Sequence, residues 1–276
     1  MIGARRLGTW GFEVTEKTIE DFGAQWTRNT DNEGYYGSVQ LLYDIVGGLV
    51  LPEELRGARV ADIGSGTGRI VNMLLDGEVQ SVIAVEPSAA FDVLKVNTAE
   101  RASSIEYVRG PGEALPADRE LDFVFSLGVI HHIPKPDPVL RAAYASLRPG
   151  GSVVLWLYGY EGNEVYLAVA RPLRLLTTHL PDAVVDVLSA GLDYALDPYI
   201  ALARRLPLPL RDYFVGHYGK LDRKKRRLTV FDQLNPAYAK YYRREEVVSL
   251  LERSGFVDIE VEARHGYSWT ARGRRP

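Results

Sequence analysis

The sequence predicts an α/β fold built on a seven-stranded, mostly parallel sheet with an antiparallel last strand and helices on both faces. One observation is the alternation of short apolar runs, typical of buried strands, with segments whose apolar residues recur at helical spacing. Another is a glycine-rich loop, residues 64–68, that directly follows the first apolar run. The third is the four-residue turn 264–267 between the last two runs, because so short a connection joins antiparallel strands.

The elements can be placed along the chain in order. Strands are expected at residues 60–63, 81–85, 105–108, 121–125, 153–157, 256–263 and 268–272. Helices are expected between them at residues 69–75, 89–101, 138–147 and 243–254. Repeated alternation of strand and helix is typical of a parallel sheet, so the core is predicted to be Rossmann-like.

Two regions break this alternation and divide the chain into four predicted parts. Residues 1–57 have apolar positions at helical spacing and are predicted to form an N-terminal helical cap. Its second helical stretch, through residues 41–49, is expected to end at Pro52. Residues 159–240 are mostly helical in pattern, with prolines as breaks, and are predicted to be a helical insertion after the fifth strand. The core is then expected at residues 58–158, and its C-terminal helix and strand pair at 241–276.

Composition narrows the classes of partner. Of 276 residues, 46% are hydrophobic and 25% charged, and the formal net charge of −3 argues against general affinity for nucleic acid or an anionic membrane. The absence of cysteine excludes disulfides and thiolate chemistry. No apolar run reaches the roughly 18–20 residues of a membrane span, and residues 1–6 lack the pattern of a signal peptide. We therefore expect a cytoplasmic enzyme, monomer or homodimer, with no nucleic-acid or membrane partner.

The glycine loop predicts the kind of ligand. Its spacing is G-x-G-x-G, whereas dinucleotide-binding loops have G-x-G-x-x-G. Asp62 stands just before the first glycine, where its carboxylate would repel a pyrophosphate but attract a sulfonium and an α-amino group. Glu86 ends the second apolar run, where a carboxylate can accept hydrogen bonds from two ribose hydroxyls. The pattern therefore favours S-adenosylmethionine (SAM) over a nicotinamide cofactor.

Five motifs in order carry a family resemblance. They are Asp62–Arg69, Val85–Ser88, Gly112–Pro116, Asp122–Pro134 and Leu147–Gly151. Together they resemble the class I SAM-dependent methyltransferase family, and within it the chain is most similar to the small-molecule O-, N- and C-methyltransferases. The resemblance covers residues 57–160, and residues 243–272 for the last helix and strand pair.

The resemblance implies a cofactor site residue by residue. The methionyl end of SAM would lie over the glycine loop above Asp62, and the ribose and adenine would lie beside Glu86 and the residues after it. The implied cofactor-binding residues, with an aromatic lid residue added, are Trp26, Asp62, Gly64, Ser65, Gly66, Gly68, Glu86, Pro87, Ser88, Gly112, Glu113, Leu127 and Gly128. The family often has an aspartate where this chain has Pro111, so Glu113 or a backbone group would have to contact the adenine amino group.

Aromatic residues and one histidine are the candidates for the reacting centre. Aromatic faces attract a sulfonium and exclude water, and imidazole titrates near neutrality. The predicted catalytic residues are Tyr36, Tyr158, His131 and Tyr242. Adjacent histidines cannot chelate one metal ion as a helical i, i+4 pair does, and no acidic cluster joins them, so no metal is expected.

The expected reaction is in-line transfer of the methyl group of SAM to a small-molecule acceptor. One alternative uses the same pocket: an aromatic cage could fold the cofactor onto itself, as in SAM cyclases that release methylthioadenosine and azetidine-2-carboxylate. Another is a SAM-binding module without catalysis. The basic run 223–227 is interpreted as a solvated helix or loop face, with binding of a phosphate-bearing ligand as the alternative.

Overall fold

The computed structural model describes residues 5–177, 179–234 and 238–276. They fold into two compact units. The larger, here called the sheet unit, comprises residues 1–158, 238–262 and 269–276, and the smaller, the helical unit, comprises 159–237 and 263–268. The predicted N-terminal cap and the core belong to one unit, and the insertion forms most of the other.

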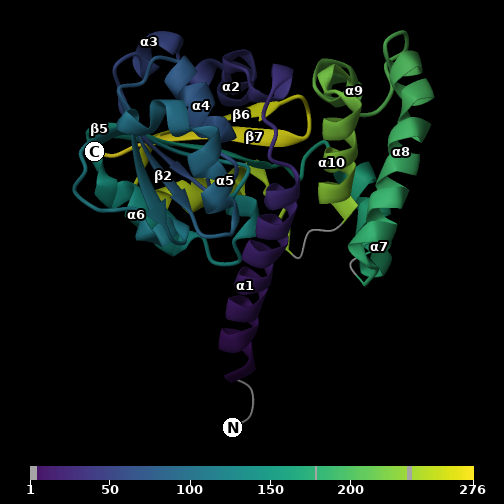
Figure 1. Cartoon of the computed structure of the whole chain (residues 1–276), viewed down its shortest axis with the longest axis horizontal. Helices are drawn as coiled ribbons and strands as arrows, with labels where there is room; N and C mark the ends of the chain where they lie inside the picture. Colours follow the sequence, from purple (N-terminus) through teal and green to yellow (C-terminus); the bar gives the residue numbers. More distant parts are fainter. Residues whose placement is uncertain (1–4, 178, 235–237) are drawn as a thin grey trace. The chain divides into compact units, whose positions relative to one another are not determined.

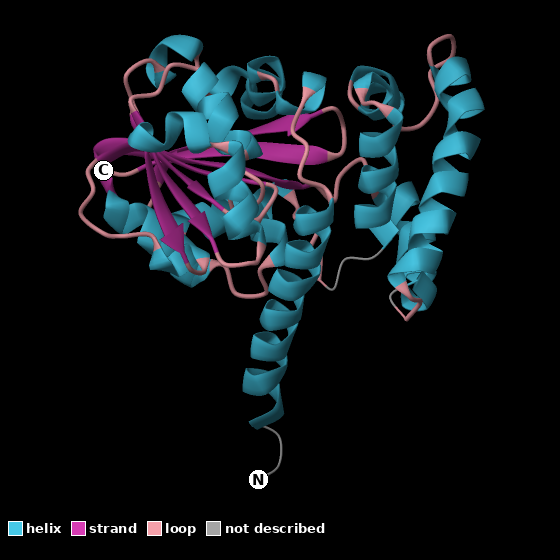
Figure 2. Cartoon of the chain, viewed as in Figure 1, coloured by secondary structure: helices cyan, strands magenta, loops and turns pink. Residues whose placement is uncertain are grey.

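Seven strands form one sheet in the order β3-β2-β1-β4-β5-β7-β6 (Figures 1 and 2). Their bounds are β1 Arg59–Ile63, β2 Ser81–Glu86, β3 Ile105–Arg109, β4 Leu121–Leu127, β5 Leu147–Tyr158, β6 Val257–Arg264 and β7 Ser268–Arg274. The first five pair in parallel, and β6 and β7 are joined by a turn too short for anything but an antiparallel pair. The predicted fold class is therefore confirmed.

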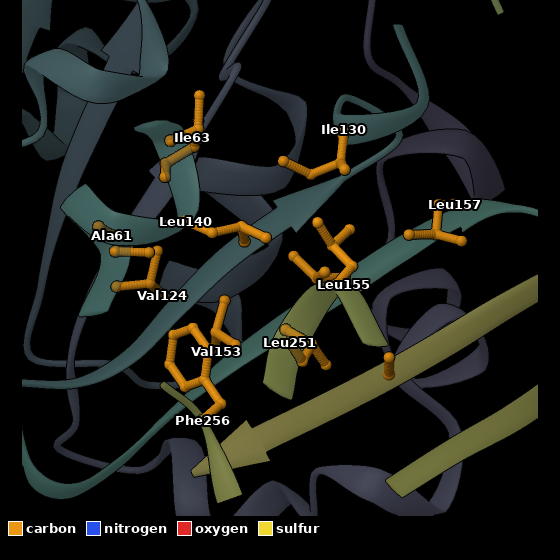
Figure 3. Close-up of a cluster of buried hydrophobic side chains, with 14 of the residues drawn as sticks. Ala61, Ile63, Val124, Ile130, Leu140, Val153, Leu155, Leu157, Leu251 and Phe256 are labelled. Atoms are coloured by element: carbon orange, nitrogen blue, oxygen red, sulfur yellow. The ribbon is translucent and has the colours of Figure 1, made fainter. Parts of the chain in front are cut away.

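Helices of the sheet unit lie on both faces of this sheet (Figure 2). They are α1 Arg5–Arg28, α2 Val39–Val46, α3 Pro52–Leu55, α4 Arg69–Asp76, α5 Ala90–Asn97, α6 Asp137–Ser146 and α11 Arg244–Glu252. Side chains alternate between the two faces along each strand. In β1, Val60 packs in one apolar cluster, whereas Ala61 and Ile63, two residues apart, both pack in the other. Figure 3 shows part of the second cluster, in which Phe256 closes the space below Val124 and Val153.

Three predicted boundaries are wrong for local reasons. Pro52 does not end the second helical stretch: α2 already ends at Val46 because Gly47 adopts a positive φ of 61°, and Pro52 is the first residue of α3. The helix expected over 89–101 stops at Asn97 and continues as a 3₁₀ turn, Ala99–Ser104. Strand β5 begins six residues early because Leu147 already pairs with Leu121 across an irregularity in the ladder.

The helical unit contains α7 Glu164–Thr177, α8 Asp182–Ala203, α9 Arg211–Gly216 and α10 Arg223–Leu234. Helix α10 packs against α7 and α8 and begins with the basic run. The expected solvated basic face is present at Arg223 and Lys224, which are exposed, but not at Lys225 and Arg226, which are 1% and 9% exposed. Arg226 is held by ion pairs to two aspartates of α8, and buried charges of this kind persist only when they are paired.

None of the described helices combines the length and the apolar content that a bilayer crossing requires.

Candidate cofactor and acceptor site

The glycine loop has a backbone that only glycine adopts without strain. Gly64, Gly66 and Gly68 have φ values of 80°, 52° and 85°, in the left-handed region. The N–H groups of Gly64 and Ser65 both donate to the carbonyl of Val85, at 2.8 and 3.0 Å, which ties the loop to the end of β2. The loop thus lies at the carboxyl ends of β1 and β2, where ligands of parallel sheets bind.

Asp62 lies under this loop and is 1% exposed. Its Oδ2 atom has no hydrogen-bond partner within the protein. Burial raises the pKa of Asp62 to about 7, and the nearby Glu86 adds to the rise, while Ser65 and Arg69 oppose it. A buried carboxylate without a partner is costly, so this oxygen fits a site whose cationic ligand completes it. Together with the left-handed glycine backbone above it, this carboxylate fits the methionyl end of SAM.

We expect SAM affinity to fall as the pH drops below 7 because of Asp62. Bound cationic ligand stabilises the carboxylate, so binding to the protonated form must release a proton. The Kd should then rise by about tenfold per pH unit below pH 7. Calorimetric titration between about pH 5.5 and 7.5 measures this, with Asp62→Asn as the reference for titration of SAM itself. A Kd that changes equally in both proteins would rule Asp62 out.

Glu86 lies at the end of β2 and is 5% exposed. Its Oε2 accepts from the N–H of Gly66 at 2.8 Å, and its Oε1 accepts from the N–H and hydroxyl of Ser88 at 2.9 and 2.5 Å. The carboxylate is thus fixed between the glycine loop and the turn after β2. Oε2 has accepted only one hydrogen bond, so it can still accept another from a ribose hydroxyl.

Helix α1 lies against this edge of the sheet through its C-terminal half. Gly23 lets it approach closely, since a Cβ there would stand 3.1 Å from the Cβ of Ser88. Trp26 lies over the glycine loop: a Cβ on Gly66 would be 3.9 Å from the indole Cδ1 and Nε1. The segment after α1 is also tied down, because Thr67 donates to the side chain of Asn32 at 2.8 Å.

Removing the Trp26 indole should weaken SAM binding. An aromatic face beside a cation contributes up to about 2 kcal/mol when water is excluded, so Trp26→Ala is expected to raise the Kd by about 5- to 30-fold. Trp26→Phe keeps a ring and should retain most of the affinity. An unchanged Kd for the alanine variant would show that Trp26 only covers the loop.

The other implied cofactor residues lie at or just after the ends of four strands, β1 to β4. Gly112 is buried between Val139 and Ile63, whose side chains leave no room for a Cβ, whereas Pro111 and Glu113 are exposed. The remaining four are Pro87 and Gly128, which are half-buried, and Ser65 and Leu127, which are buried. Gly128 follows β4 with a φ of 86° and directs the chain into the loop that carries the histidines.

His131 is the most unusual polar group of this loop. It is 1% exposed, and neither ring nitrogen has a hydrogen-bond partner within the protein. Burial, and then the neighbouring His132, holds the pKa of His131 well below its usual range, so the imidazole is neutral. The loop also contacts the cofactor region, because the side chain of Val129 packs on the backbone of Gly64.

Aromatic rings surround His131. Its centroid lies 3.9 Å from that of Tyr158 and 6.0 Å from that of Trp156, both on β5. Tyr241 also stacks on Tyr158, with centroids 5.2 Å apart and planes at 22°. His132, next in sequence, meets Phe22 of α1 at 4.7 Å. These six residues form what we call the aromatic cluster.

The four predicted catalytic residues do not share one environment. His131 and Tyr158 are in contact within the aromatic cluster, as described above. Tyr36 lies in the 3₁₀ turn Gly34–Gly37, where the guanidinium of Arg69 stands 4.4 Å from its ring centroid. Tyr242 is 3% exposed and packs in the core beside α11. The three predicted tyrosines therefore lie in three different environments.

Tyr241 was not among the predicted site residues, and the reason is local. The N–H of Tyr242 donates to the carbonyl of Tyr158 at 2.9 Å in an extended segment, where adjacent side chains point to opposite sides. Tyr242 therefore enters the core, and Tyr241 enters the aromatic cluster. The sequence shows a tyrosine pair here, but only this backbone pairing decides which member faces the site.

No group of three or more histidine, aspartate or glutamate side chains in the described part of the chain is arranged to hold a metal ion.

Comparisons with known proteins agree with this arrangement. Residues 61–155 match the family model described as a methyltransferase domain. A ubiquinone biosynthesis O-methyltransferase of Roseobacter denitrificans is 30% identical over 173 residues, which cover 57% of this chain and 69% of that protein. The fold and site define a Rossmann-like SAM-dependent enzyme. With this relative, the chain belongs to the class I SAM-dependent methyltransferase family.

Other relatives share only the cofactor-binding region. A tRNA U34 carboxymethyltransferase of Pseudoalteromonas translucida is 33% identical over 114 residues, covering 41% of this chain and 35% of that protein. The chain thus matches about a third of the length of this relative. Among solved structures, the pyocyanin biosynthetic protein PhzM has a TM-score of 0.53 at 14% identity, covering 86% of this chain and 55% of that one. The methyltransferase SibL has a TM-score of 0.51 at 19% identity with the same coverages.

Proposed function

We propose that this protein transfers the methyl group of SAM to the hydroxyl oxygen of a small, planar acceptor, with His131 taking the hydroxyl proton. The observation that carries the proposal is His131 itself: a neutral, buried imidazole with two unpartnered nitrogens, set among aromatic rings. Such an imidazole is in the neutral form that can accept a proton, and a catalytic role would explain why its buried nitrogens have no partner within the protein.

Different residues of the chain would bind SAM and accept the proton. Bound SAM supplies an electrophilic methyl group, so a strong base is needed only to remove the proton of the acceptor. The glycine loop and Asp62 would hold the methionyl end, and Glu86 the ribose. Val129 links the glycine loop to the His131 loop through its contact with Gly64. The acceptor oxygen would bond to the methyl carbon as the carbon–sulfur electron pair moves to sulfur, and the proton would move to His131. Positioning supplies most of the rate enhancement in such displacements.

The aromatic cluster supports a planar acceptor. Trp156 is half-buried and lies beside His131, so its ring could offer an apolar surface to an aromatic acceptor. The relative that shares most of its length with this chain is itself described as an O-methyltransferase. The carboxymethyltransferase relatives are described as acting on tRNA, but the sheet unit of this chain has 27 acidic and 21 basic residues, which does not favour a polyanion.

The predicted cage of a SAM cyclase receives less support. The cage would be formed by the three tyrosines predicted as catalytic, and these lie in different environments. Tyr36 lies under Arg69, Tyr158 in the aromatic cluster and Tyr242 in the core. Cyclisation needs no acceptor, and it is therefore tested by the same experiment as methyl transfer.

The experiment is mass spectrometry of products from the purified protein with SAM, alone and with a panel of simple phenols, amines and bulk tRNA. We expect S-adenosylhomocysteine and a methyl ether only when a hydroxylated acceptor is present. Methylthioadenosine formed from SAM alone would identify a cyclase. Methylation confined to amines or to tRNA would overturn the proposed acceptor class while leaving methyl transfer intact.

A further inference from the structure

In the helical unit, acidic side chains of helix α8 face the basic side chains of α10. Asp193 is 1% exposed and pairs with Arg226 of α10 at 2.7 Å and with Arg223 at 3.0 Å. Two turns toward the N-terminus of α8, Asp186 accepts from the Nε of Arg227 at 2.7 Å. The acidic side chains of α8 are thus paired with the basic run of α10; Asp193 is buried there, and Asp186 stays partly exposed.

The opposite side of α8 is exposed and carries no charge. Among the described residues of this helix, the exposed ones are Ala183, Val184, Val187, Leu188, Gly191, Leu192, Tyr194, Ala195, Pro198, Ala201 and Leu202. At 100° per residue these positions span about half of the helix circumference. Their large side chains are well exposed: Val187 is 69% and Tyr194 63% accessible. We call this surface the outer face of α8.

Helix α7 adds exposed aliphatic side chains. Its large exposed hydrophobic residues are Val165, Val169, Leu173, Leu175 and Leu176, and Leu180 follows in the loop before α8. Isolated exposed apolar residues are ordinary, but so many on two successive helices that pack on α10 form a surface that marks an interaction site.

Charge at this unit indicates which kind of partner fits. The helical unit has 12 basic and 9 acidic residues, whereas the rest of the chain has 21 basic and 27 acidic residues. The exposed cations Arg204 and Arg205 directly follow α8, and Arg171 is exposed on α7. Long cationic side chains beside an apolar face can reach lipid headgroups while their stems remain on the apolar surface.

We propose that the outer face of α8, with the exposed apolar residues of α7, rests on the surface of an anionic lipid bilayer. The apolar side chains enter the boundary between headgroups and acyl chains, and the arginines contact anionic headgroups. A second copy of this chain fits less well, because it would bring two positively charged units together. The expectation of no membrane partner rested on the net charge of the whole chain, which hides the opposite charges of its two units.

The test is sedimentation of the full chain with lipid vesicles, without SAM or acceptor, so that it is independent of the proposed function. We expect binding to phosphatidylcholine vesicles containing about 30% phosphatidylglycerol, weaker binding to phosphatidylcholine alone, and a loss of binding as salt rises from about 50 to 500 mM. The double variant Val187→Glu/Leu188→Glu should lose binding. The matched control is Val96→Glu, since Val96 is 74% exposed but lies in the sheet unit, and it should bind normally.

Charge reversal in Arg204→Glu/Arg205→Glu should weaken binding to anionic vesicles at least about tenfold and leave the helical content unchanged. The salt titration of the native chain keeps the test valid should any variant fail to fold. Absence of binding to both kinds of vesicle would overturn the proposal. So would a dimer in sedimentation velocity that Val187→Glu/Leu188→Glu dissociates, since the outer face of α8 would then be covered by a second copy.

Discussion

A His131→Asn variant is expected to lose about 10²- to 10⁴-fold in kcat while its Kd for SAM changes little. The His131 imidazole packs against the ring of Tyr158, and neither of its nitrogens has a hydrogen-bond partner within the protein. Its replacement therefore removes the proposed proton acceptor without breaking a hydrogen bond. The measurement is the rate of S-adenosylhomocysteine release with the acceptor found in the phenol panel, and calorimetry for SAM binding.

The pH profile separates a base from a packing residue. Burial holds the pKa of His131 well below its usual range, and the neutral form is the one that accepts a proton. At saturating SAM, the kcat of the native chain should therefore persist below the usual histidine pKa of about 6.5 and fall only as the pH drops through the lowered value. The asparagine variant should lack this acidic limb. An unchanged kcat in the variant would assign His131 to packing.

A Gly64→Ala variant is expected to bind SAM about 30- to 1,000-fold more weakly than the native chain. Gly64 has a φ of 80°, and an added Cβ would stand 2.4 Å from the Cγ2 of Val129. Left-handed backbone costs about 1–2 kcal/mol for a residue with a Cβ, and overpacking adds about 1–3 kcal/mol, so the loop must move. Calorimetry with SAM measures the loss.

The matched control for this variant is Gly191→Ala. Gly191 lies in a helix, and an added Cβ would meet nothing within 4 Å, so SAM affinity should stay at the native value. Thermal unfolding of both variants separates a moved loop from a general loss of fold. Native SAM affinity in Gly64→Ala would mean that Val129 can withdraw freely and that the loop does not depend on this contact.

Much of the cofactor side of the site could be predicted from local patterns. Asp62, the three glycines and Glu86 stand at the ends of adjacent strands, and the carboxyl ends of parallel strands meet at one edge of the sheet. Sequence order alone therefore brings them together. Pro111, in contrast, could be recognised only as a departure from the aspartate that the family often has at this position. The structure places both Pro111 and Glu113 at exposed positions.

The acceptor side depended on contacts between distant segments. His131 was a candidate from its position after β4, but its lack of hydrogen-bond partners follows from packing against Tyr158 on β5. Tyr241 comes from a segment more than 80 residues beyond β5, and its choice over Tyr242 rests on one backbone hydrogen bond. No periodicity in the chain encodes such a pairing.

By itself, the sequence determined the α/β class, the positions of most strands and helices of the core and a glycine-rich SAM-binding loop, because strand–helix alternation, glycine spacing and acidic strand ends are local features. Only the tertiary structure decided which aromatic residues surround His131, which side chains pair with the basic run and which side of α8 is exposed. Arginines of α10 neutralise the aspartates of α8 and turn its apolar side to the surface. The physical reason is that pairing of buried charges and packing of rings depend on neighbours that the fold supplies.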